Sequence, residues 1–358
     1  MEKIIFRQTE LVDREKERKF IKEWFDTIPS EILWIYGPKS TGKTTIIEYI
    51  VENELFDDFK LFKSSKYNVK YINFRRKLFG SYESFVDSLL FVDDGKLDEE
   101  FKMSLNLVAF KVELKTHQEI KEKKLDLFDT LFEQLKESPK KNILIFDEIQ
   151  SLEDIYIDKE RELLKEFLNF CASLTKESHI SHVVLLSSNT IFINKLYNNS
   201  KLKETSYFYK ICHFPKEVAV EYLKNNGFNE KEANLIWEYL GGSIFRLKRI
   251  VRDKQNNWFD DLEEYLKKQV EIALSEIKMT FREFRKMNKR ESIKEFKILA
   301  QKIVDKGYFI INDDIEISDF TIEYMTEKEI LFFDPLENKI TANNQVFFNA
   351  FKLLGENE

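Results

Sequence analysis

The sequence predicts an α/β fold in which a parallel β-sheet is flanked by helices and is followed by a helical region and a small C-terminal domain. Short apolar runs alternate along the chain with segments in which apolar residues recur at helical spacing. This alternation is typical of strands joined by crossover helices. Three of the runs, at 32–36, 142–146 and 182–186, are followed directly by glycine, acidic or hydroxyl residues. Because parallel sheets bind ligands at the carboxyl ends of their strands, these positions are candidates for a site.

Length and composition limit the possible classes of protein. With 358 residues the chain exceeds one compact core, so we expect two or three domains. The net charge of −7 argues against nucleic-acid binding over the whole surface and leaves only a local patch. The two cysteines show neither C-x-x-C pairing nor metal-ligand spacing, which fits a reducing compartment. The four histidines form no metal-spaced cluster. No apolar run reaches the roughly 20 residues of a membrane span, and the first residues lack a signal-peptide core, so we expect a cytoplasmic protein without membrane contact.

The first of the three positions carries a phosphate-binding pattern, G-x-x-x-x-G-K-[ST], between the run at 32–36 and a helical segment. Its glycines permit backbone angles that let successive N–H groups surround an anion, and the positive end of the helix points at the same anion. We expect Lys43 to reach the β- and γ-phosphates and the Thr44 hydroxyl to hold Mg²⁺. The predicted nucleotide-binding residues of this loop are Gly37, Pro38, Lys39, Ser40, Thr41, Gly42, Lys43, Thr44 and Thr45.

The segments around this loop have weaker patterns. Arg75 and Arg76 follow a predicted strand at its carboxyl end, and we favour solvated arginines over contacts to a ligand. Apolar spacing predicts helices at 9–25 and 118–137, and alternation predicts a strand at 68–74 and an inserted strand or hairpin at 105–114.

Two acids follow the second run, which we expect to form the strand beside the phosphate loop. Asp147 at the tip of this strand is placed to hold the water shell of Mg²⁺. Glu148 is placed to polarise an attacking water as a general base. A guanine-reading N-K-x-D segment is missing, since Asn338–Thr341 ends in threonine. These features favour a hydrolytic site for ATP rather than GTP.

The third run ends in Ser187, Ser188 and Asn189, whose short polar side chains could hydrogen-bond the γ-phosphate or the attacking water. An ordinary turn is the alternative, because serine and asparagine favour turns. A fifth strand is predicted at 207–214 and stops at Pro215.

Together these motifs resemble the archaeal ATPase group of P-loop proteins, which is related to the AAA+ and signal-transducing STAND ATPases. The resemblance rests on Leu11–Glu15, where the family usually has Phe-Val-Gly-Arg-Glu, on the phosphate loop, and on Phe146–Gln150, close to the family's Asp-Glu-Phe-Gln. It continues through Leu240–Ser243 and covers roughly residues 6–250. Asp13 replaces the usual glycine.

The resemblance implies roles for further residues. Val12, Arg14 and Glu15 would lie near the adenine and the nucleotide pocket. Ser188 or Asn189 would occupy the first sensor position, and Arg246 would be a candidate second sensor. AAA+ proteins commonly supply an arginine finger from the segment that here runs from Asn189 to Pro215, and this segment contains no arginine. We therefore expect slow hydrolysis that acts as a switch. The implied domains are an AAA+-like core at 1–214, a helical lid at 215–275 and a winged-helix-like domain at 276–358.

Two uses of such an ATPase stay open. A basic segment at 281–290 could bind nucleic acid, although a solvated charged helix is the favoured interpretation. In the predicted winged helix, the would-be recognition helix at 318–327 is acidic and would repel phosphates. We therefore favour a regulatory switch with a protein partner, and a DNA-binding or DNA-processing ATPase is the alternative. The sequence leaves the oligomeric state open.

Overall fold

The structure is a computed structural model in which the chain forms two compact units, each with its own buried core. The first unit comprises Met1–Tyr36, Lys43–Ser187 and Ser200–Lys210, and the second comprises Gly37–Gly42, Ser188–Asn199 and Ile211–Glu358. The described residues are 4–6, 9–76, 80–92, 104–105, 107–153, 155–157, 162–197, 203–311 and 317–356.

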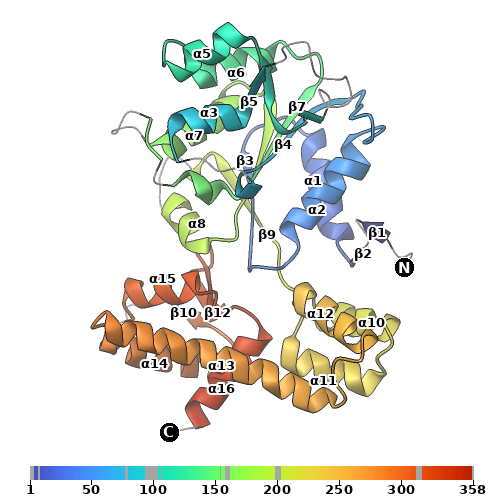
Figure 1. The fold of residues 1–358 in the computed structure, drawn as a ribbon, viewed down its shortest axis with the longest axis vertical. Coiled ribbons are helices and arrows are strands. Elements are labelled where there is room, and N and C mark those ends of the chain that lie inside the picture. Colours follow the sequence, from blue (N-terminus) through green and yellow to red (C-terminus); the bar gives the residue numbers. More distant parts are fainter. Residues whose placement is uncertain are drawn as a thin grey trace. The chain divides into compact units, whose positions relative to one another are not determined.

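The first unit is built around a five-stranded sheet with the order β4-β7-β8-β3-β9, in which every pair of neighbours is parallel. This confirms the predicted parallel sheet. Its elements are β1 (Ile4–Phe6), β2 (Thr9–Leu11), α1 (Glu15–Asp26), β3 (Ile32–Tyr36), α2 (Lys43–Ile50), β4 (Tyr67–Asn73), α3 (Tyr82–Leu89), β5 (Leu90–Val92), β6 (Phe110–Val112), α5 (Leu114–Lys121), α6 (Leu127–Lys136), β7 (Lys141–Asp147), α7 (Leu163–Ala172), β8 (Ser181–Leu186) and β9 (Ser206–Lys210) (Figure 1).

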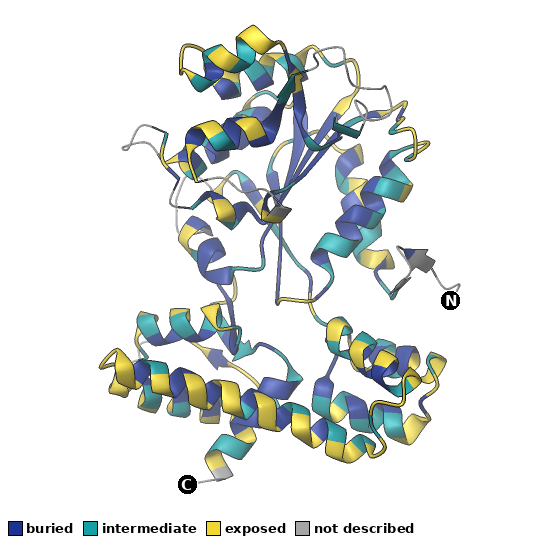
Figure 2. Ribbon diagram, viewed as in Figure 1, coloured by how far each residue is buried: buried dark blue, intermediate teal, exposed yellow. Residues whose placement is uncertain are grey.

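Helices on both sides bury the central strands of this sheet. Helices α1 and α2 lie on one side, and α3 and α7 lie on the other (Figure 1). The strands are dark in Figure 2, and all residues of β3 and β8 are buried, which explains their nearly continuous apolar sequences. Trp34 is fully buried in β3, and its indole N–H donates to Ser206 Oγ at 3.1 Å. Aromatic rings join β7 to α7, where Phe146 and Phe167 meet edge to face at 4.8 Å.

The order of the strands corrects one expectation. Strand β8 pairs with both β3 and β7, so it lies between the phosphate-loop strand and the strand that ends at Asp147. Apolar runs show which segments are buried strands, but three such runs carry no information on which of them takes the middle position.

Three predicted elements also differ from the structure. The first helix begins only at Glu15, because Thr9–Leu11 pairs as β2 with β1. Among the described residues of the segment predicted as an inserted strand or hairpin, Phe110–Val112 alone is a strand, and it pairs in parallel with β5. The helix predicted at 118–137 is divided into α5 and α6 by a turn that contains Lys123 at φ +58°. Side-chain spacing does not detect such a local break.

The second unit is mainly helical and contains a three-stranded antiparallel sheet with the order β10-β12-β11. Its elements are α8 (Thr190–Tyr197), α10 (Lys216–Asn225), α11 (Glu230–Leu240), α12 (Ile244–Gln255), α13 (Leu262–Lys286), α14 (Arg290–Lys306), β10 (Phe309–Ile310), α15 (Asp319–Glu327), β11 (Leu331–Asp334), β12 (Lys339–Ala342) and α16 (Gln345–Glu356).

From α14 onward the second unit has the predicted order of a winged helix: helix, short strand, helix, hairpin and terminal helix. Helix α14 ends at Gly307, whose left-handed φ of +82° lets the chain reverse into β10. The predicted domain boundaries stay a prediction, and the one at 275–276 falls inside the continuous helix α13.

Candidate active site

The phosphate loop connects β3 to α2 with a backbone that only particular residues can adopt. Gly37 has φ +143° and Gly42 has φ +90°, so both glycines of the pattern stand in conformations that side chains disfavour. A Cβ atom on Gly37 would lie 2.2 Å from the carbonyl oxygen of Ile211, which leaves no room for any larger residue. Helix α2 begins at Lys43, as the pattern predicts.

The first residues of α2 and the tip of β7 meet in the first unit. Thr44 Oγ1 donates to Asp147 Oδ2 at 2.8 Å. The same carboxylate oxygen lies 3.1 Å from Asn73 Nδ2 and 3.4 Å from the Tyr71 hydroxyl, both on β4. Asp147 is almost fully buried. The structure therefore brings together the two residues that the sequence predicts as ligands of Mg²⁺.

Burial shifts the pKa of two charged groups at this position. It lowers the pKa of Lys43 to about 8, although the negative charges of Glu148 and Asp147 oppose the shift. Burial also raises the pKa of Asp147, and the hydrogen bond from Thr44 opposes that shift. Lys43, Asp147 and Glu148 thus form one mutually interacting charge cluster that is shielded from water, where each charge acts strongly on a bound anion or cation.

Glu148 follows Asp147 in a left-handed conformation, with φ +62°, and both of its carboxylate oxygens have partners. Arg75 forms an ion pair with Oε1. Gln150 Nε2 donates to Oε2 at 2.5 Å, and Ser187 Oγ donates in turn to Gln150 Oε1 at 2.9 Å. The sequence indicated solvated charge at Arg75, but the structure places this side chain on the predicted general base. The one sequence signal for this contact was the location of Arg75 at the carboxyl end of a predicted strand.

The two sensor candidates lie at the start of α8 in the second unit. Asn189 Oδ1 accepts a hydrogen bond from the backbone N–H of Phe192 at 3.0 Å, which is the contact of a helix N-cap. Ser188 precedes it and is half-buried. The sensor role of both residues stays a prediction.

The remaining nucleotide-site candidates fall in different units. Val12 and Arg14 precede α1 in the first unit, where Arg14 is buried, pairs with Glu17 at 2.6 Å and acts electrostatically on Lys43. Arg246 lies on α12 in the second unit. Burial lowers its pKa, opposed by the charge of Glu276 on α13. Arg14 thus acts on the charge cluster, whereas the opposite charge that acts on Arg246 lies within its own unit.

Comparison with known proteins identifies the family. Residues 11–250 match a family described as an ATPase domain predominantly from Archaea. The chain belongs to this archaeal ATPase family. An uncharacterized ATP-binding protein of Methanocaldococcus jannaschii is 29% identical over 380 residues, covering 97% of this chain and 98% of the relative. A second one from that organism is 31% identical over 294 residues, covering 75% and 77%.

A solved structure supports the fold of this family member. The ADP form of the Aeropyrum pernix ORC2 protein superposes with a TM-score of 0.50 at 11% identity, covering 98% of this chain and 96% of that protein. At this identity the likeness shows the fold alone. It agrees with the predicted α/β fold in which a parallel sheet is followed by a helical region and a small C-terminal domain.

One departure from the usual sequence of the archaeal ATPase family has a structural counterpart. Asp13 stands where the family usually has glycine, and its φ is +31°. Positive φ is the conformation that glycine adopts readily and aspartate adopts more often than most residues. In the turn before α1, Asp13 therefore has a backbone conformation that is also open to glycine.

The described residues contain neither a membrane-spanning helix nor a cluster of metal-ligating side chains. None of the helices within the described ranges is both long and apolar enough to cross a bilayer. Among the same residues, no group of three or more His, Cys, Asp or Glu side chains is arranged to hold a metal ion.

Proposed function

We propose that this chain binds ATP with Mg²⁺ and hydrolyses it slowly, as a switch coupled to a macromolecular partner. The observation that supports this best is the 2.8 Å hydrogen bond between Thr44 and Asp147, which joins the phosphate-loop helix to the tip of β7. Lys43 and Glu148 complete the same cluster. These are the residue types that phosphoryl transfer from ATP requires: a cation for the phosphates, oxygen ligands for a metal and a carboxylate for water.

The donor set at Thr44 and Asp147 fits Mg²⁺. This ion prefers oxygen ligands and usually keeps several waters besides one or two protein groups and the phosphates of the nucleotide. A hydroxyl and a buried carboxylate within hydrogen-bond distance match that pattern, and the lack of a larger acidic cluster among the described residues agrees with it. Bound there, Mg²⁺ would neutralise charge on the β- and γ-phosphates.

Each residue of the proposed site would have its own role in the reaction. The loop from Gly37 to Thr45 would hold the phosphates, and Lys43 would balance the charge that moves onto the leaving ADP oxygen. Water would attack the γ-phosphorus as the bond to ADP breaks, and Glu148 would accept the proton that the water loses. Ser188 or Asn189 would orient this water or the γ-phosphate. Arg246 would contact the nucleotide as a second sensor, and Val12 and Arg14 would lie near its base.

Two features support slow turnover. Arg75 and Gln150 hold both oxygens of Glu148, so the carboxylate would have to leave one of these partners to act as a base. The segment from Asn189 to Pro215 contains no arginine, and an arginine finger contributes about 10³–10⁵ in rate. We expect a steady-state turnover below about 10 s⁻¹ without a partner. A faster basal rate would contradict the proposal that this ATPase acts as a slow switch.

Substitutions in the cluster test the proposal. Glu148→Gln should bind ATP as the parent chain does and hydrolyse it roughly 10²–10⁴-fold more slowly, because the amide cannot accept the proton. Lys43→Ala should lose tight nucleotide binding. Equilibrium binding of a fluorescent ATP analogue and phosphate release measure the two effects separately. Glu133→Gln, at an exposed glutamate of α6, is the matched control and should change neither. An unchanged rate in Glu148→Gln would remove Glu148 from its role.

A DNA-binding or DNA-processing ATPase is the second candidate. The observation that favours it is a group of exposed cations at the junction of α13 and α14 in the second unit: Arg282, Arg285, Lys286, Lys289 and Arg290. Against it, the exposed face of α15 carries Asp319, Glu323 and Glu327, which would repel phosphates from the usual recognition helix.

ATP turnover measured with duplex, branched and single-stranded DNA across a salt series separates the two candidates. The switch with a protein partner predicts that none of these DNAs changes turnover. Stimulation that fades as salt rises, and that the double variant Arg285→Gln, Lys286→Gln reduces, would instead establish the DNA-dependent ATPase.

A further inference from the structure

One face of α12 in the second unit carries exposed aromatic and cationic side chains. Phe245, Arg249 and Arg252 recur at a spacing of three or four residues, which places them along one side of the helix. All three are exposed, and Phe245 is 59% exposed. The opposite side is buried through apolar residues: Leu247, Ile250 and Val251. The packing of α12 thus leaves an aromatic ring and two guanidinium groups at the surface.

This row of side chains continues past the end of α12 to Trp258. The backbone N–H of Trp258 donates to the carbonyl oxygen of Asp253 at 2.9 Å, which fixes the turn after the helix. The indole is 63% exposed, and the Arg252 guanidinium lies 5.2 Å from its ring centre. This cation–π contact joins the ring to the row on the helix. The four residues that form the α12 stripe are therefore Phe245, Arg249, Arg252 and Trp258.

A buried carboxylate holds the two arginines of the α12 stripe. Arg252 Nε donates to Asp253 Oδ1 at 3.1 Å, and Arg249 Nε lies 3.8 Å from Oδ2. The Tyr265 hydroxyl of α13 donates to the same Oδ2 at 2.7 Å. Within the described part of the chain, neither arginine has an ion pair with a second carboxylate. Two guanidinium groups therefore share one carboxylate, which leaves excess positive charge between the two aromatic ends of the stripe.

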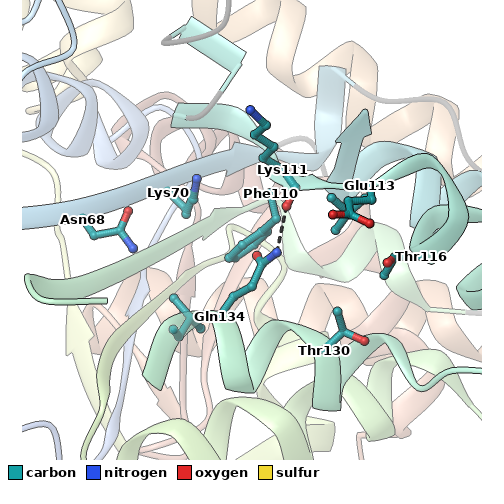
Figure 3. Close-up of a pocket in the computed structure, with 10 residues that line it drawn as sticks. Asn68, Lys70, Phe110, Lys111, Glu113, Thr116, Thr130 and Gln134 are labelled. Carbon is teal, nitrogen blue, oxygen red and sulfur yellow. Dashed lines mark hydrogen bonds between the residues drawn. The ribbon is translucent and has the colours of Figure 1, made fainter. Parts of the chain in front are cut away.

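The polar groups around the cavity of the first unit are used differently. This cavity of about 610 Å³ is lined by residues of β4, β6 and α6 (Figure 3). There Gln134 Nε2 donates to the carbonyl oxygen of Lys111 at 2.7 Å (Figure 3), and the Lys70 ammonium donates to that of Ala109 at 3.0 Å. These side chains bond to the backbone of the chain itself. The rings and guanidinium groups of the α12 stripe are instead exposed, where another molecule can reach them.

The composition of the α12 stripe favours a protein partner. Tryptophan, phenylalanine and arginine are enriched at protein–protein interfaces, and tryptophan and arginine often supply most of the binding energy. Nucleic-acid binding depends on contacts with many phosphates, whereas the stripe offers two arginines. Exposed Asp260, two residues after Trp258, would also repel a phosphate backbone at that end. A peptide can instead place an apolar side chain at each aromatic end and carboxylates between them.

We propose that the α12 stripe docks an acidic segment of a partner protein. Carboxylates of this segment would pair with Arg249 and Arg252, and apolar side chains would pack on Phe245 and Trp258. The 12 residues of α12 span about 18 Å, so the two apolar side chains would lie about that far apart. An extended segment covers this length with about five or six residues. The inference rests on the proposed function only in taking the partner to be a protein, and docking requires no ATP hydrolysis.

Selection of a random-peptide display library on the immobilised full chain tests this proposal. We expect the enriched peptides to carry Asp or Glu between two large apolar residues that are about five or six positions apart. An enriched peptide is then synthesised with a fluorescent label, and its affinity for the full chain is measured by fluorescence anisotropy. This affinity should fall as the salt concentration rises, because the contact with the arginines is electrostatic.

Variants of exposed side chains locate the site at which the peptide binds. Phe245→Ala and Trp258→Ala should each weaken binding at least about tenfold, as truncation of an anchoring aromatic residue typically does. Arg249→Gln should weaken binding about several-fold and reduce its salt dependence. The matched controls are Met279→Ala, at an exposed methionine of α13, and Lys294→Gln, at an exposed lysine of α14 that also has an ion pair. Both controls should bind the peptide as the parent chain does.

Several results would overturn the proposal. One is a selection that enriches no peptide, or peptides without the acidic and apolar pattern. Another is equal affinity in the parent chain and the variants of the α12 stripe. Self-association of the parent chain that Trp258→Ala abolishes, measured by analytical ultracentrifugation, would assign the stripe to a second copy of the chain. Binding of a single-stranded oligonucleotide that the same variant abolishes would assign the stripe to nucleic acid.

Two measurements separate docking from folding and from the proposed ATPase. Far-UV circular dichroism and binding of the fluorescent ATP analogue should be the same in the parent chain and in every variant, because the substituted side chains are exposed. A loss of peptide binding with both quantities unchanged would therefore belong to the α12 stripe. A parent chain that binds the peptide but not the ATP analogue would contradict the proposed function and leave the docking surface supported.

Discussion

Two side chains hold the predicted general base from opposite ends of its carboxylate. Arg75 comes from the turn after β4, and Gln150 comes from the turn after β7. The Arg75 side chain is 64% exposed, so its ion pair adds little to stability, on the order of 1 kcal/mol or less. Its position matters more, because it holds one oxygen of the Glu148 carboxylate.

Replacement of Arg75 should therefore alter hydrolysis rather than folding. We predict that Arg75→Gln raises the basal rate several-fold, because Glu148 then has one partner fewer to leave, while the midpoint of urea unfolding changes little. Phosphate release and circular dichroism measure the two quantities. Lys66→Gln is the control, since it removes an exposed ion pair to Asp26 in the same unit. A lower rate in Arg75→Gln would mean that the guanidinium assists the reaction.

The sequence predicted some residues of the site better than others. Lys43, Thr44, Asp147 and Glu148 could be placed because their spacing and their strand and helix context repeat a known chemical arrangement. The contacts of Arg75 with Glu148 cross between two strands that lie far apart in the chain, and no local pattern encodes such a contact.

At the scale of elements, the sequence predicted the parallel sheet, the winged-helix order and the loop between β3 and α2. These predictions came from apolar runs and from the glycine, proline and polar residues that end them. Two features could not. The middle position of β8 depends on pairing between segments of similar apolar character. The parallel pairing of β5 with β6 joins two three-residue strands that the chain separates widely, and strands so short have little periodicity.

The loop between β3 and α2 tolerates little change at its first glycine. We predict that Gly37→Ala destabilises the chain by roughly 3 kcal/mol, because the new Cβ combines a disfavoured backbone angle with overlap at Ile211. Nucleotide binding should be lost as well. Gly80→Ala is the control, since a Cβ there meets nothing within 4 Å. Urea unfolding and ATP-analogue binding report the difference, and equal stability of both variants would contradict this account of the loop.

At the scale of the whole molecule, acid should weaken the first unit before the carboxylates titrate fully. His182 on β8 is buried, its ring meets Phe25 edge to face at 5.7 Å, and burial lowers its pKa from 6.5 to about 4. Below pH 6.5 the imidazole of His182 is protonated in the unfolded chain but stays neutral in the folded chain until the pH approaches 4. The free energy of unfolding therefore falls as the pH drops toward 4. The loss amounts to about 3 kcal/mol over this range.

His182→Phe, which removes the titrating group and keeps a ring against Phe25, tests this effect. Urea unfolding of both chains at about pH 7.5 and about pH 5 gives two differences, and the variant should show the smaller one. Equal acid sensitivity in the two chains would assign the effect to other groups.

The burial of Trp34 has an optical consequence. An indole in a water-free environment emits at shorter wavelength than one in solvent and is shielded from dissolved quenchers. Trp34 is fully enclosed in the strand that leads into the phosphate loop, whereas Trp258 in the second unit is 63% exposed. Trp24 in the first unit and Trp237 in the second are half-buried. The most shielded part of the intrinsic fluorescence therefore belongs to the first unit, and the most readily quenched part belongs to the second.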